Sequence, residues 1–449
     1  METRDGPGAL DLGVSWLGAP SVRSPLKLST IEGDRIYNFV ADDQCVRMDA
    51  VGTCGDVVEE AATAAFERAG PRELLFFEPE DLTAAIVTCG GLCPGINNAI
   101  RAATLELLNH YGVREVLGVR YGFAGLNPEE GDPPIPLTRQ AVEGIHHDGG
   151  SVLGSSRGPQ AAPTLVDTLE RLDVGLLLVI GGDGSMRGAD AICDEIGRRN
   201  APIAVVGIPK SIDNDIPLVD KTFGYETAFS IAVESIRAAH TEAAGYRNGV
   251  GLVRLMGRHS GFIAASAAVA EADADFVLVP EVPLVLDGPN GFLEALSARL
   301  LSNGHVVVVV AEGTGQDLLQ ENDSPAERDE SGNVRLLDIG THLRRRIEGD
   351  LRGRGIKHTV KYIDPSYLVR SAPANPSDSV YSSDLARHAV HAGMAGKTGL
   401  LVGYWNGEYT HVPLRAGIGR SKVIDLEGEL WHAVLECTGQ PALWGEETA

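Results

Sequence analysis

The chain has 449 residues, with 38 Lys or Arg against 62 Asp or Glu, which gives a formal net charge of −24 at pH 7. An acidic balance of this size argues against a general nucleic-acid or anionic-membrane surface, so an anionic ligand would need a local basic pocket. Apolar residues make up 43% and charged residues 22%, which excludes wholesale disorder. The 54 glycines are about 12% of the chain, against a usual level of roughly 7%.

The six cysteines form no CxxC pair and no metal-finger spacing, which indicates reduced core or loop thiols in a cytoplasmic protein. They are Cys45, Cys54, Cys89, Cys93, Cys193 and Cys437. The N-terminus is acidic and glycine-rich and lacks the basic and apolar regions of a secretory signal. The longest aliphatic run, Val306 to Ala311, is too short to span a membrane, so we expect neither secretion nor membrane insertion.

From residue 83 onward, short apolar runs alternate with longer segments of helical period, whereas residues 1–82 show no such rhythm. The runs lack in/out alternation, as strands covered on both faces do, and segments of about 15–20 residues between them suit crossover helices. We expect an α/β fold with two parallel sheets, preceded by an extension with one edge strand and a candidate helix at 57–69. The expected buried strands are 84–91, 113–122, 175–182, 202–209, 251–256, 275–280 and 305–313.

The first strand end with ligand chemistry is the turn CGGLCPG at residues 89–95, which leads into a helix. Ligands of parallel sheets bind at the carboxyl ends of strands, and a glycine turn before a helix exposes backbone N–H groups to a phosphate. The turn is neither a Walker A sequence nor a full GxGxxG, and many such turns hold two glycines for steric reasons. Phosphate binding and plain turn geometry both remain open here.

The second strand end, VIGGDGSMRGAD at residues 179–190, places Asp183 between Gly182 and Gly184. An aspartate at this point can reach a Mg²⁺ ion while the bare glycine backbone approaches phosphate oxygens closely. Ser185 can cap the helix that follows. A tight turn with the aspartate as a cap is the alternative.

The third strand end, IPKSIDNDIPLVDKTFGYETA at residues 208–228, holds Asp213 and Asp215 beside Lys210 and Ser211. Two carboxylates this close raise one proton affinity unless a cation, either Lys210 or Mg²⁺, offsets their repulsion. One of them is therefore a candidate general base for a hydroxyl group. A purely structural role explains this polar group at a strand end less well.

The fourth strand end, RLMGRHSGFIA at residues 254–264, carries Arg258 just before a helix. An arginine there can hold a phosphate or stabilise charge on a transferring phosphoryl group, although an ordinary surface arginine is the alternative. Further candidates are Glu312, after the Val306–Ala311 run, and Lys361, Tyr367 and Arg370 in KYIDPSYLVRS, which together could grip a sugar phosphate.

Two charged segments remain. Residues 314–333 hold six acidic residues and one arginine without apolar periodicity, which predicts a solvated, mobile insertion. From Arg344 to Lys361 seven Lys or Arg stand against Glu348 and Asp350. A solvated helix face and a pocket for a phosphorylated ligand or effector are both open for that stretch.

In this order, the segments GGxxPG, GGDGS, PKSIDND, MGRHSG and YIDPSYLVR resemble the 6-phosphofructokinase family from about Ala84 to Gly403. The N-terminal extension and the segment KYIDPSYLVRSAPANPSDSVY look most like the longer ATP-dependent enzymes of plants and trypanosomatids. The resemblance implies two Rossmann-like α/β domains with the active site between them. The implied division is an extension at 1–82, a nucleotide-binding domain at 83–222, a sugar-phosphate-binding domain at 223–405 from which the chain crosses back to the first, and a C-terminal segment at 406–449.

The reaction that this resemblance implies is Mg²⁺-dependent phosphoryl transfer from ATP to the 1-hydroxyl of fructose 6-phosphate, a step of glycolysis. Asp213 resembles the catalytic base, Asp183 the metal ligand, Asp215 its charged neighbour and Arg258 a catalytic cation. Residues that resemble the nucleotide contacts are Gly91, Arg157, Gly158, Gly182, Asp183, Gly184 and Ser185. Those that resemble the sugar-phosphate contacts are Ser211, Ile212, Asp213, Met256, Gly257, Arg258, Glu312, Lys361, Tyr367, Leu368, Val369 and Arg370.

Two positions depart from the family pattern. Tyr367 stands where the short bacterial enzymes have histidine, and Gly249 stands where a neighbouring subunit usually supplies an arginine. Arg247 or Asn248 are the nearby candidates to replace that arginine. The resemblance implies a homo-oligomer, a tetramer, which is open to allosteric control by an effector that the sequence does not name.

Two positions bear on whether the phosphoryl donor is ATP or pyrophosphate. Pyrophosphate-using family members typically carry a second aspartate after the metal-binding one, where this chain has Gly184, and they tend to carry the lysine present here as Lys210. Glycine with lysine resembles the plant and trypanosomatid ATP enzymes, so we expect ATP, with pyrophosphate and a catalytically weak regulatory subunit as alternatives. NAD kinase shares the GGDG turn but would leave the PKSIDND, MGRHSG and YLVR segments unexplained.

Overall fold

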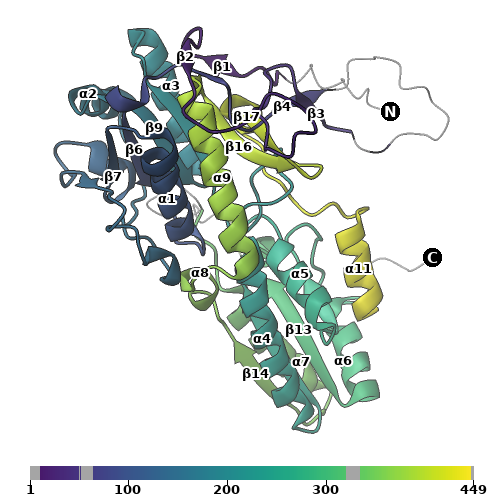
Figure 1. The fold of residues 1–449 in the computed structure, drawn as a ribbon. Helices are drawn as coiled ribbons and strands as arrows, with labels where there is room; N and C mark the ends of the chain where they lie inside the picture. Colours follow the sequence, from purple (N-terminus) through teal and green to yellow (C-terminus); the bar gives the residue numbers. More distant parts are fainter. Residues whose placement is uncertain (1–10, 50, 52–63, 320–333, 446–449) are drawn as a thin grey trace, which may run out of the picture. The chain divides into compact units, whose positions relative to one another are not determined.

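A computed structural model describes residues 11–49, 51, 64–319 and 334–445, which divide into two compact units (Figure 1). Unit 1 comprises the chain up to Ser211, then Ile216–Phe223 and Pro373–Arg420. Unit 2 comprises Ile212–Asp215, Gly224–Ala372 and the chain from Ser421 onward. The division differs from the boundaries read off the sequence, because the N-terminal extension belongs to unit 1 and the chain returns to that unit at Pro373.

Unit 1 is built on a nine-stranded sheet in the order β3-β4-β17-β16-β10-β9-β6-β7-β8. Strands β16, β10, β9, β6 and β7 run parallel, and the flanking strands β17, β4, β3 and β8 are each joined by antiparallel pairing. The expected strands of this unit are confirmed as parallel and buried. The bounds are β3 (Cys45–Arg47), β4 (Ala65–Arg68), β6 (Thr83–Thr88), β7 (Glu115–Val119), β8 (Ile135–Pro136), β9 (Val174–Gly181), β10 (Ala204–Pro209), β16 (Leu400–Trp405) and β17 (Glu408–Pro413).

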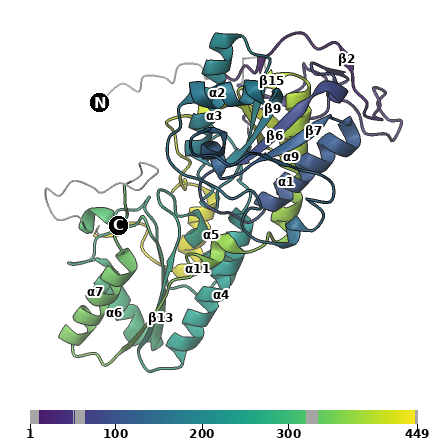
Figure 2. The same cartoon turned by 90° about the vertical axis from the view of Figure 1, so that its left-hand side faces the viewer.

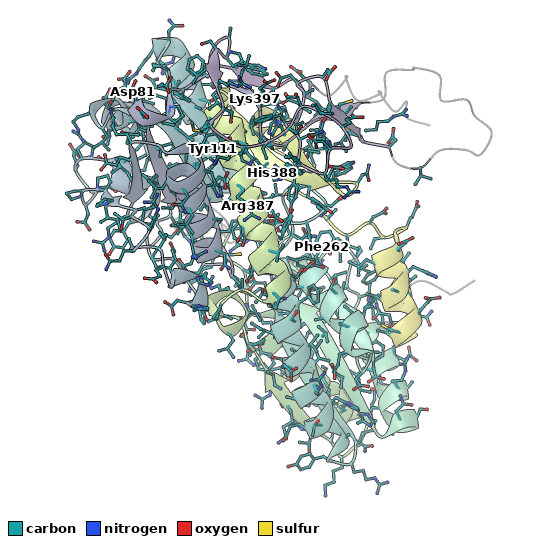
Figure 3. All side chains as sticks on the ribbon, in the orientation of Figure 1. Asp81, Tyr111, Phe262, Arg387, His388 and Lys397 are labelled. Carbon is teal, nitrogen blue, oxygen red and sulfur yellow. The ribbon has the colours of Figure 1, made fainter. Side chains whose placement is uncertain are left out.

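Helices cover both faces of this sheet (Figure 2). Helices α2 (Ala162–Arg171) and α3 (Asp183–Arg199) pack on one face, where their apolar residues join those of β6, β9 and β10 in one core. Helices α1 (Ile96–Leu105), which continues as a π-helix through Tyr111, and α9 (Pro376–Met394) pack together on the other. One contact between these helices is a hydrogen bond near His388, in which the buried Tyr111 hydroxyl lies 2.8 Å from His391 Nδ1 (Figure 3).

The N-terminal extension is part of unit 1 through strand pairing. Strands β4 and β3 continue the large sheet beyond β17, while β1 (Ser15–Trp16) pairs with β15 (Lys397–Thr398) and β2 (Val22–Arg23) with β5 (Leu74–Leu75). The helix expected at 57–69 is wrong for its last residues, because Ala65–Arg68 forms β4. Pairing with β17 overrides the local helical pattern there, and residues 57–63 lie outside the described residues.

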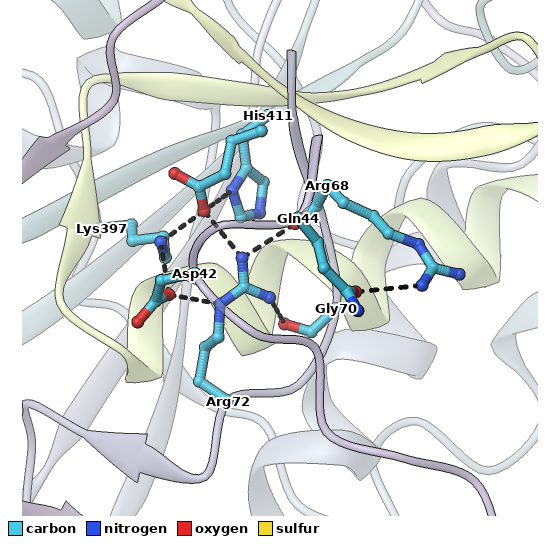
Figure 4. A network of polar contacts seen from close by, with 8 residues as sticks. Asp42, Gln44, Arg68, Gly70, Arg72, Lys397 and His411 are labelled. Carbon is cyan, nitrogen blue, oxygen red and sulfur yellow. Dashed lines mark hydrogen bonds and ion pairs between the residues drawn. The ribbon is translucent and has the colours of Figure 1, made fainter. Parts of the chain in front are cut away.

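A network of buried charges fixes the extension to the sheet (Figure 4). Arg72 lies 2.7 Å from both Asp42 and Glu67, and the fully buried Lys397 and His411 also contact Glu67. Burial opposes the charged form of Glu67, but the hydrogen bonds and charges of His411 and Lys397 outweigh it and lower the pKa of that carboxyl to about 2. The Glu67 carboxylate therefore joins Arg72 of the extension to Lys397 of β15 and His411 of β17.

Unit 2 is built on a four-stranded parallel sheet in the order β12-β13-β11-β14. Its strands are β11 (Gly249–Leu255), β12 (Phe276–Leu278), β13 (His305–Ala311) and β14 (Thr359–Ile363), and β14 was not among the expected strands. Figure 2 shows α6 and α7 on one side of β13 and α4 with α5 on the other. The helices are α4 (Tyr225–Ala244), α5 (Phe262–Glu271), α6 (Phe292–Asn303), α7 (Ile339–Gly353), the short α8 (Leu368–Ser371) and α11 (Glu429–Thr438), while the short α10 (Leu414–Gly417) belongs to unit 1.

The two charged segments have different outcomes. Residues 320–333 of the acidic insertion lie outside the described residues. The basic stretch forms α7 and β14, and several of its cations are paired, for example Arg344 with Glu348 and Arg346 with Asp287. This favours the solvated helix face over an effector pocket for Arg344–Lys361.

Within the described ranges, no helix is long and apolar enough to cross a membrane. Burial raises the pKa of the Cys89 and Cys193 thiols to about 12, as expected of unreactive core thiols.

Candidate active site

Three neighbouring strands of unit 1, β6, β9 and β10, end beside one another, and each leads into a turn that the sequence singled out. The Cys89 N–H donates to the Ile180 carbonyl at 2.9 Å, and the Lys210 N–H donates to the Gly181 carbonyl at 3.0 Å. These bonds bring the three turns to one edge of the sheet. The glycine-turn cluster, as we name it, comprises Gly90, Gly91, Ser155–Gly158, Gly182–Ser185 and Lys210.

The loop that carries Arg157 and Gly158 is tied directly to the first glycine turn. The Gly90 N–H donates to the Ser156 carbonyl at 3.1 Å, and Ser155 Oγ donates to the Gly90 carbonyl at 2.6 Å. Gly158 has a φ of +97°, a conformation that L side chains rarely adopt. The loop thus presents Arg157 next to the turn in which backbone groups can meet a phosphate.

Asp183 is the first residue of α3, so the sequence between Gly181 and Ser185 builds a helix N-terminus at the strand end. A Cβ on Gly181 would lie 2.3 Å from the Ser185 Cβ, so only glycine allows this turn. The first-turn N–H groups and the positive helix end favour an anion here. The Asp183 carboxylate lies 2.7 Å from the Arg187 guanidinium.

Lys210 lies beneath the first glycine turn rather than on the surface. Its side chain is buried, with 5% of the residue exposed, and Nζ donates to the Gly91 carbonyl at 2.8 Å. A buried ammonium at this point holds the Gly91 backbone in place and adds positive charge beneath a turn suited to phosphate.

The segment Ile212–Asp215 belongs to unit 2 and is held there by two backbone contacts. Ser260 Oγ donates to the Asp213 carbonyl at 2.9 Å, and the Lys422 N–H donates to the Asp215 carbonyl at 2.9 Å. Asn214 between them has a φ of +54°, a conformation that asparagine tolerates better than most residues. Asp213 and Asp215 are therefore fixed against the segments that follow β11.

Asp213 has the electrostatic setting of a general base. The residue is partly buried and its Oδ1 atom is shielded from solvent. Burial raises the pKa of Asp213 to about 7, the charges of Asp215 and Glu312 add to the rise, and the N–H group and guanidinium of Arg258 oppose it. A carboxyl group with this pKa can accept a proton near neutral pH.

The remaining residues of this site follow β11 and β13. The Glu312 N–H donates to the Leu255 carbonyl at 2.9 Å, and the Gly313 N–H donates to the Gly257 carbonyl at 3.0 Å. A Cβ on Gly313 would lie 1.9 Å from the Arg258 carbonyl oxygen, so the close approach of the two segments requires glycine. Arg258 Nη1 also donates to the Val334 carbonyl. The Asp213 cluster, as we name it, comprises Ile212–Asp215, Met256–Arg258, Glu312 and Asp364.

The segment after β14 is brought to this cluster only in part. Burial raises the pKa of Glu312, and the charge of Arg370 acts to lower it. The Arg370 guanidinium lies 4.8 Å from the centre of the Tyr367 ring. Tyr367 and Leu368 are 73% and 66% exposed, whereas Val369 is a core residue at 1%. Val369 could therefore meet a ligand through its backbone alone.

The structure does not gather Lys361 with the others. It pairs in register with Gly251, in the first half of β11, and its Nζ lies 3.1 Å from Glu242 and 4.8 Å from the centre of the Tyr246 ring. Ser211 belongs to unit 1, and its carbonyl accepts from Thr222 Oγ1.

Comparisons with known proteins show the family to which this chain belongs. The sequence profile of the family described as Phosphofructokinase matches residues 83–393. The chain is 46% identical to an ATP-dependent 6-phosphofructokinase of Amycolatopsis methanolica over 445 residues, covering 98% of this chain and 97% of that one. The chain belongs to the phosphofructokinase family.

Other members of the phosphofructokinase family confirm the expected kinship with plant and trypanosomatid enzymes. ATP-dependent 6-phosphofructokinase 1 of Arabidopsis thaliana is 44% identical over 379 residues, covering 84% of this chain and 79% of its own. The Trypanosoma brucei brucei enzyme is 44% identical over 375 residues, with 83% and 76% covered. Among solved structures, the pyrophosphate-dependent phosphofructokinase of Marinobacter aquaeolei matches in fold, with a TM-score of 0.65 at 22% identity over 82% of this chain and 92% of that one.

Two arginines that contact the site residues were not predicted from the sequence. Arg187 pairs with Asp183 four residues away, and the helical spacing is a signal that could have found it. Arg254 pairs with Glu312 and Asp364, which are 58 and 110 residues away, so the strand order alone reveals it.

The residues present fit a Mg²⁺ ion that arrives with a nucleotide. Among the residues that the structure describes, no group of three or more His, Cys, Asp and Glu could hold a metal by itself. Mg²⁺ usually binds through one or two carboxylates together with substrate phosphates, and Asp183 at a phosphate-binding helix end supplies such a carboxylate.

Proposed function

We propose that the protein is an ATP-dependent 6-phosphofructokinase, which transfers the γ-phosphoryl group of ATP to the 1-hydroxyl of fructose 6-phosphate. The observation that carries this proposal is Asp213, a carboxyl with a pKa raised to about 7 that adjoins Arg258. Membership of the phosphofructokinase family and the names of the relatives support the substrates.

The Asp213 cluster acts on the sugar phosphate. The oxygen of the 1-hydroxyl attacks the γ-phosphorus, the bond from that phosphorus to the bridging oxygen of ADP breaks, and Asp213 takes the hydroxyl proton. Arg258 stabilises the negative charge on the transferring group, and Glu312 and Arg370 orient the sugar phosphate. Met256 and Gly257 shape the backbone beside it.

The glycine-turn cluster binds the donor. The backbone of Gly91 and Gly182–Ser185 and the side chain of Arg157 hold the phosphates at the positive end of α3. Asp183 would hold Mg²⁺, which neutralises charge on the β- and γ-phosphates when bound. Gly184 leaves space for the α-phosphate, since a Cβ there meets nothing closer than Arg187 Nη2 at 3.8 Å.

We also propose a homo-oligomer, a tetramer, in which Arg247 and Lys361 serve a neighbouring subunit's sugar phosphate. A Cβ on Gly249 would lie 2.1 Å from the Ala243 carbonyl oxygen, so that position has no room for an arginine. Asn248 Nδ2 donates to the Lys357 carbonyl, which leaves the exposed Arg247 as the stronger candidate. Lys361 lies away from the Asp213 cluster of its own chain, as described above. Light scattering that returns a fully active monomer would contradict this assembly.

A coupled assay with ATP and pyrophosphate side by side tests the donor and the acceptor together. We expect Mg²⁺-dependent formation of fructose 1,6-bisphosphate with ATP and little with pyrophosphate. Turnover with pyrophosphate but not with ATP would show that pyrophosphate is the donor. No turnover with either would support a regulatory subunit. The unreactive buried thiols and the soluble substrates support a cytoplasmic location, which fractionation of the source cells would check.

A further inference from the structure

Arg254 is the next-to-last residue of β11, and its guanidinium joins two carboxylates from the ends of the neighbouring strands. Nη2 lies 2.7 Å from Glu312 after β13, and Nη1 lies 2.5 Å from Asp364 after β14. The side chain is only 18% exposed. A guanidinium can bridge two carboxylates in this way because its N–H donors diverge in one rigid plane.

The strands themselves do not need this bridge. Backbone pairing joins β11 to β13 along the whole of β11 and to β14 from Gly249 to Val253. The ladder to β13 continues beyond Arg254, where the Glu312 N–H donates to the Leu255 carbonyl. A buried arginine that the sheet does not require for its pairing points to a role in the site.

Three arginines act electrostatically on Glu312. Burial raises the pKa of its carboxyl, while the charges of Arg254, Arg258 and Arg370 lower it. Arg254 makes the direct ion pair, and the other two are the arginines that the proposed function assigns to phosphate. Without Arg254, the charges of Arg258 and Arg370 remain to attract the Glu312 carboxylate.

We propose that Arg254 is a positioning residue that holds Glu312 and Asp364 at the strand ends and so keeps Glu312 from neutralising Arg258 and Arg370. This inference rests on the proposed function, because Arg258 is assigned there to the transferring phosphoryl group and Arg370 to the sugar phosphate. Asp364 completes the arrangement, since its second oxygen accepts from the Ser366 N–H at 3.0 Å and fixes the turn after β14.

The test measures phosphate affinity in the whole enzyme, with inorganic phosphate and fructose 6-phosphate as probes in calorimetry without nucleotide. Arg254→Met should weaken the binding of both probes by at least about ten-fold, because Glu312 turns toward the phosphate-binding arginines. In the assay, the KM for fructose 6-phosphate should rise by a similar factor while the KM for ATP is unchanged. Arg254→Lys should recover part of the affinity, since an ammonium keeps the charge but not the fork.

The deciding variant is the double substitution Arg254→Met with Glu312→Gln. Removing the carboxylate's charge should restore the affinity for inorganic phosphate to within about two-fold of the wild type, although the sugar contact of Glu312 is lost. Arg299→Met, which removes a similarly half-buried arginine that contacts Asp275 at 3.3 Å in the same unit, should leave both affinities unchanged.

Unchanged phosphate affinity in Arg254→Met, or no recovery in the double variant, would overturn the proposal. If Arg254→Met does not fold by circular dichroism, Arg254→Lys alone and with Glu312→Gln gives the same comparison. A wild-type protein that binds fructose 6-phosphate without turning it over would refute the proposed function and leave this binding test intact.

Discussion

Replacing Asp213 with asparagine should lower activity and, above neutral pH, raise stability. The folded protein keeps a proton on Asp213 up to a pKa of about 7, whereas the ordinary value is 3.8. Between these two pH values the folded state binds a proton that the unfolded state has released. The contribution of Asp213 to the free energy of unfolding is therefore largest below about pH 4 and is lost as the pH rises through about 7. At 1.36 kcal/mol per pKa unit, the free energy of unfolding should fall by roughly 2–3 kcal/mol between about pH 5 and pH 8. Because Asp213 is partly exposed, we expect the lower end of this range, about 2 kcal/mol.

The asparagine variant lacks this charge and should not lose that stability. Urea unfolding of both proteins at pH 5 and pH 8, without ligands or metal, measures the difference directly. In the assay, kcat should fall by about 10²–10⁴-fold, because the proton acceptor of the transition state is gone. In the wild type, activity should fall as pH decreases through about 7, since protonated Asp213 cannot act as a base.

Asp215→Asn is the matched control on the same segment. It removes a charge that raises the pKa of Asp213, so the acidic limb of kcat/KM should move to lower pH while turnover at pH 8 is retained to a larger extent. Turnover of Asp213→Asn within ten-fold of the wild type, or the same pH dependence of stability in both proteins, would refute the reasoning.

Three further substitutions test other parts of the molecule. Gly184→Asp should fold normally, because the added Cβ makes only ordinary van der Waals contact. Its negative charge would repel the ATP α-phosphate by on the order of 4 kcal/mol at about 4 Å, so kcat/KM for ATP should fall steeply. ATP use equal to that of the wild type would refute the donor argument. Asp183→Ala should abolish MgATP binding in calorimetry, and unchanged binding would make Asp183 only a turn residue. Lys397→Met should destabilise unit 1 by about 1.5–3 kcal/mol in urea unfolding, because Glu67 loses one charged hydrogen-bond partner and keeps Arg72. A loss below about 0.5 kcal/mol would show that the network tolerates the change.

The sequence by itself determined the features that depend on near neighbours along the chain. Val306–Ala311 is apolar at every position and rich in β-branched valine, as expected of a strand covered on both faces. The glycines around Asp183 likewise predicted a helix that begins directly after a strand, because the tight turn between them needs residues without a side chain.

The tertiary structure decided what depends on strand order and burial. Strand β4 replaced the end of a predicted helix because β17, more than 300 residues later, offers it a partner. Lys361 was expected with Arg370 but lies with Glu242, because Lys361 is inside β14, whereas Arg370 is in α8 beyond the end of that strand. Arg254 has no partner within reach along the chain, and only the adjacency of β13, β11 and β14 places Glu312 and Asp364 beside it.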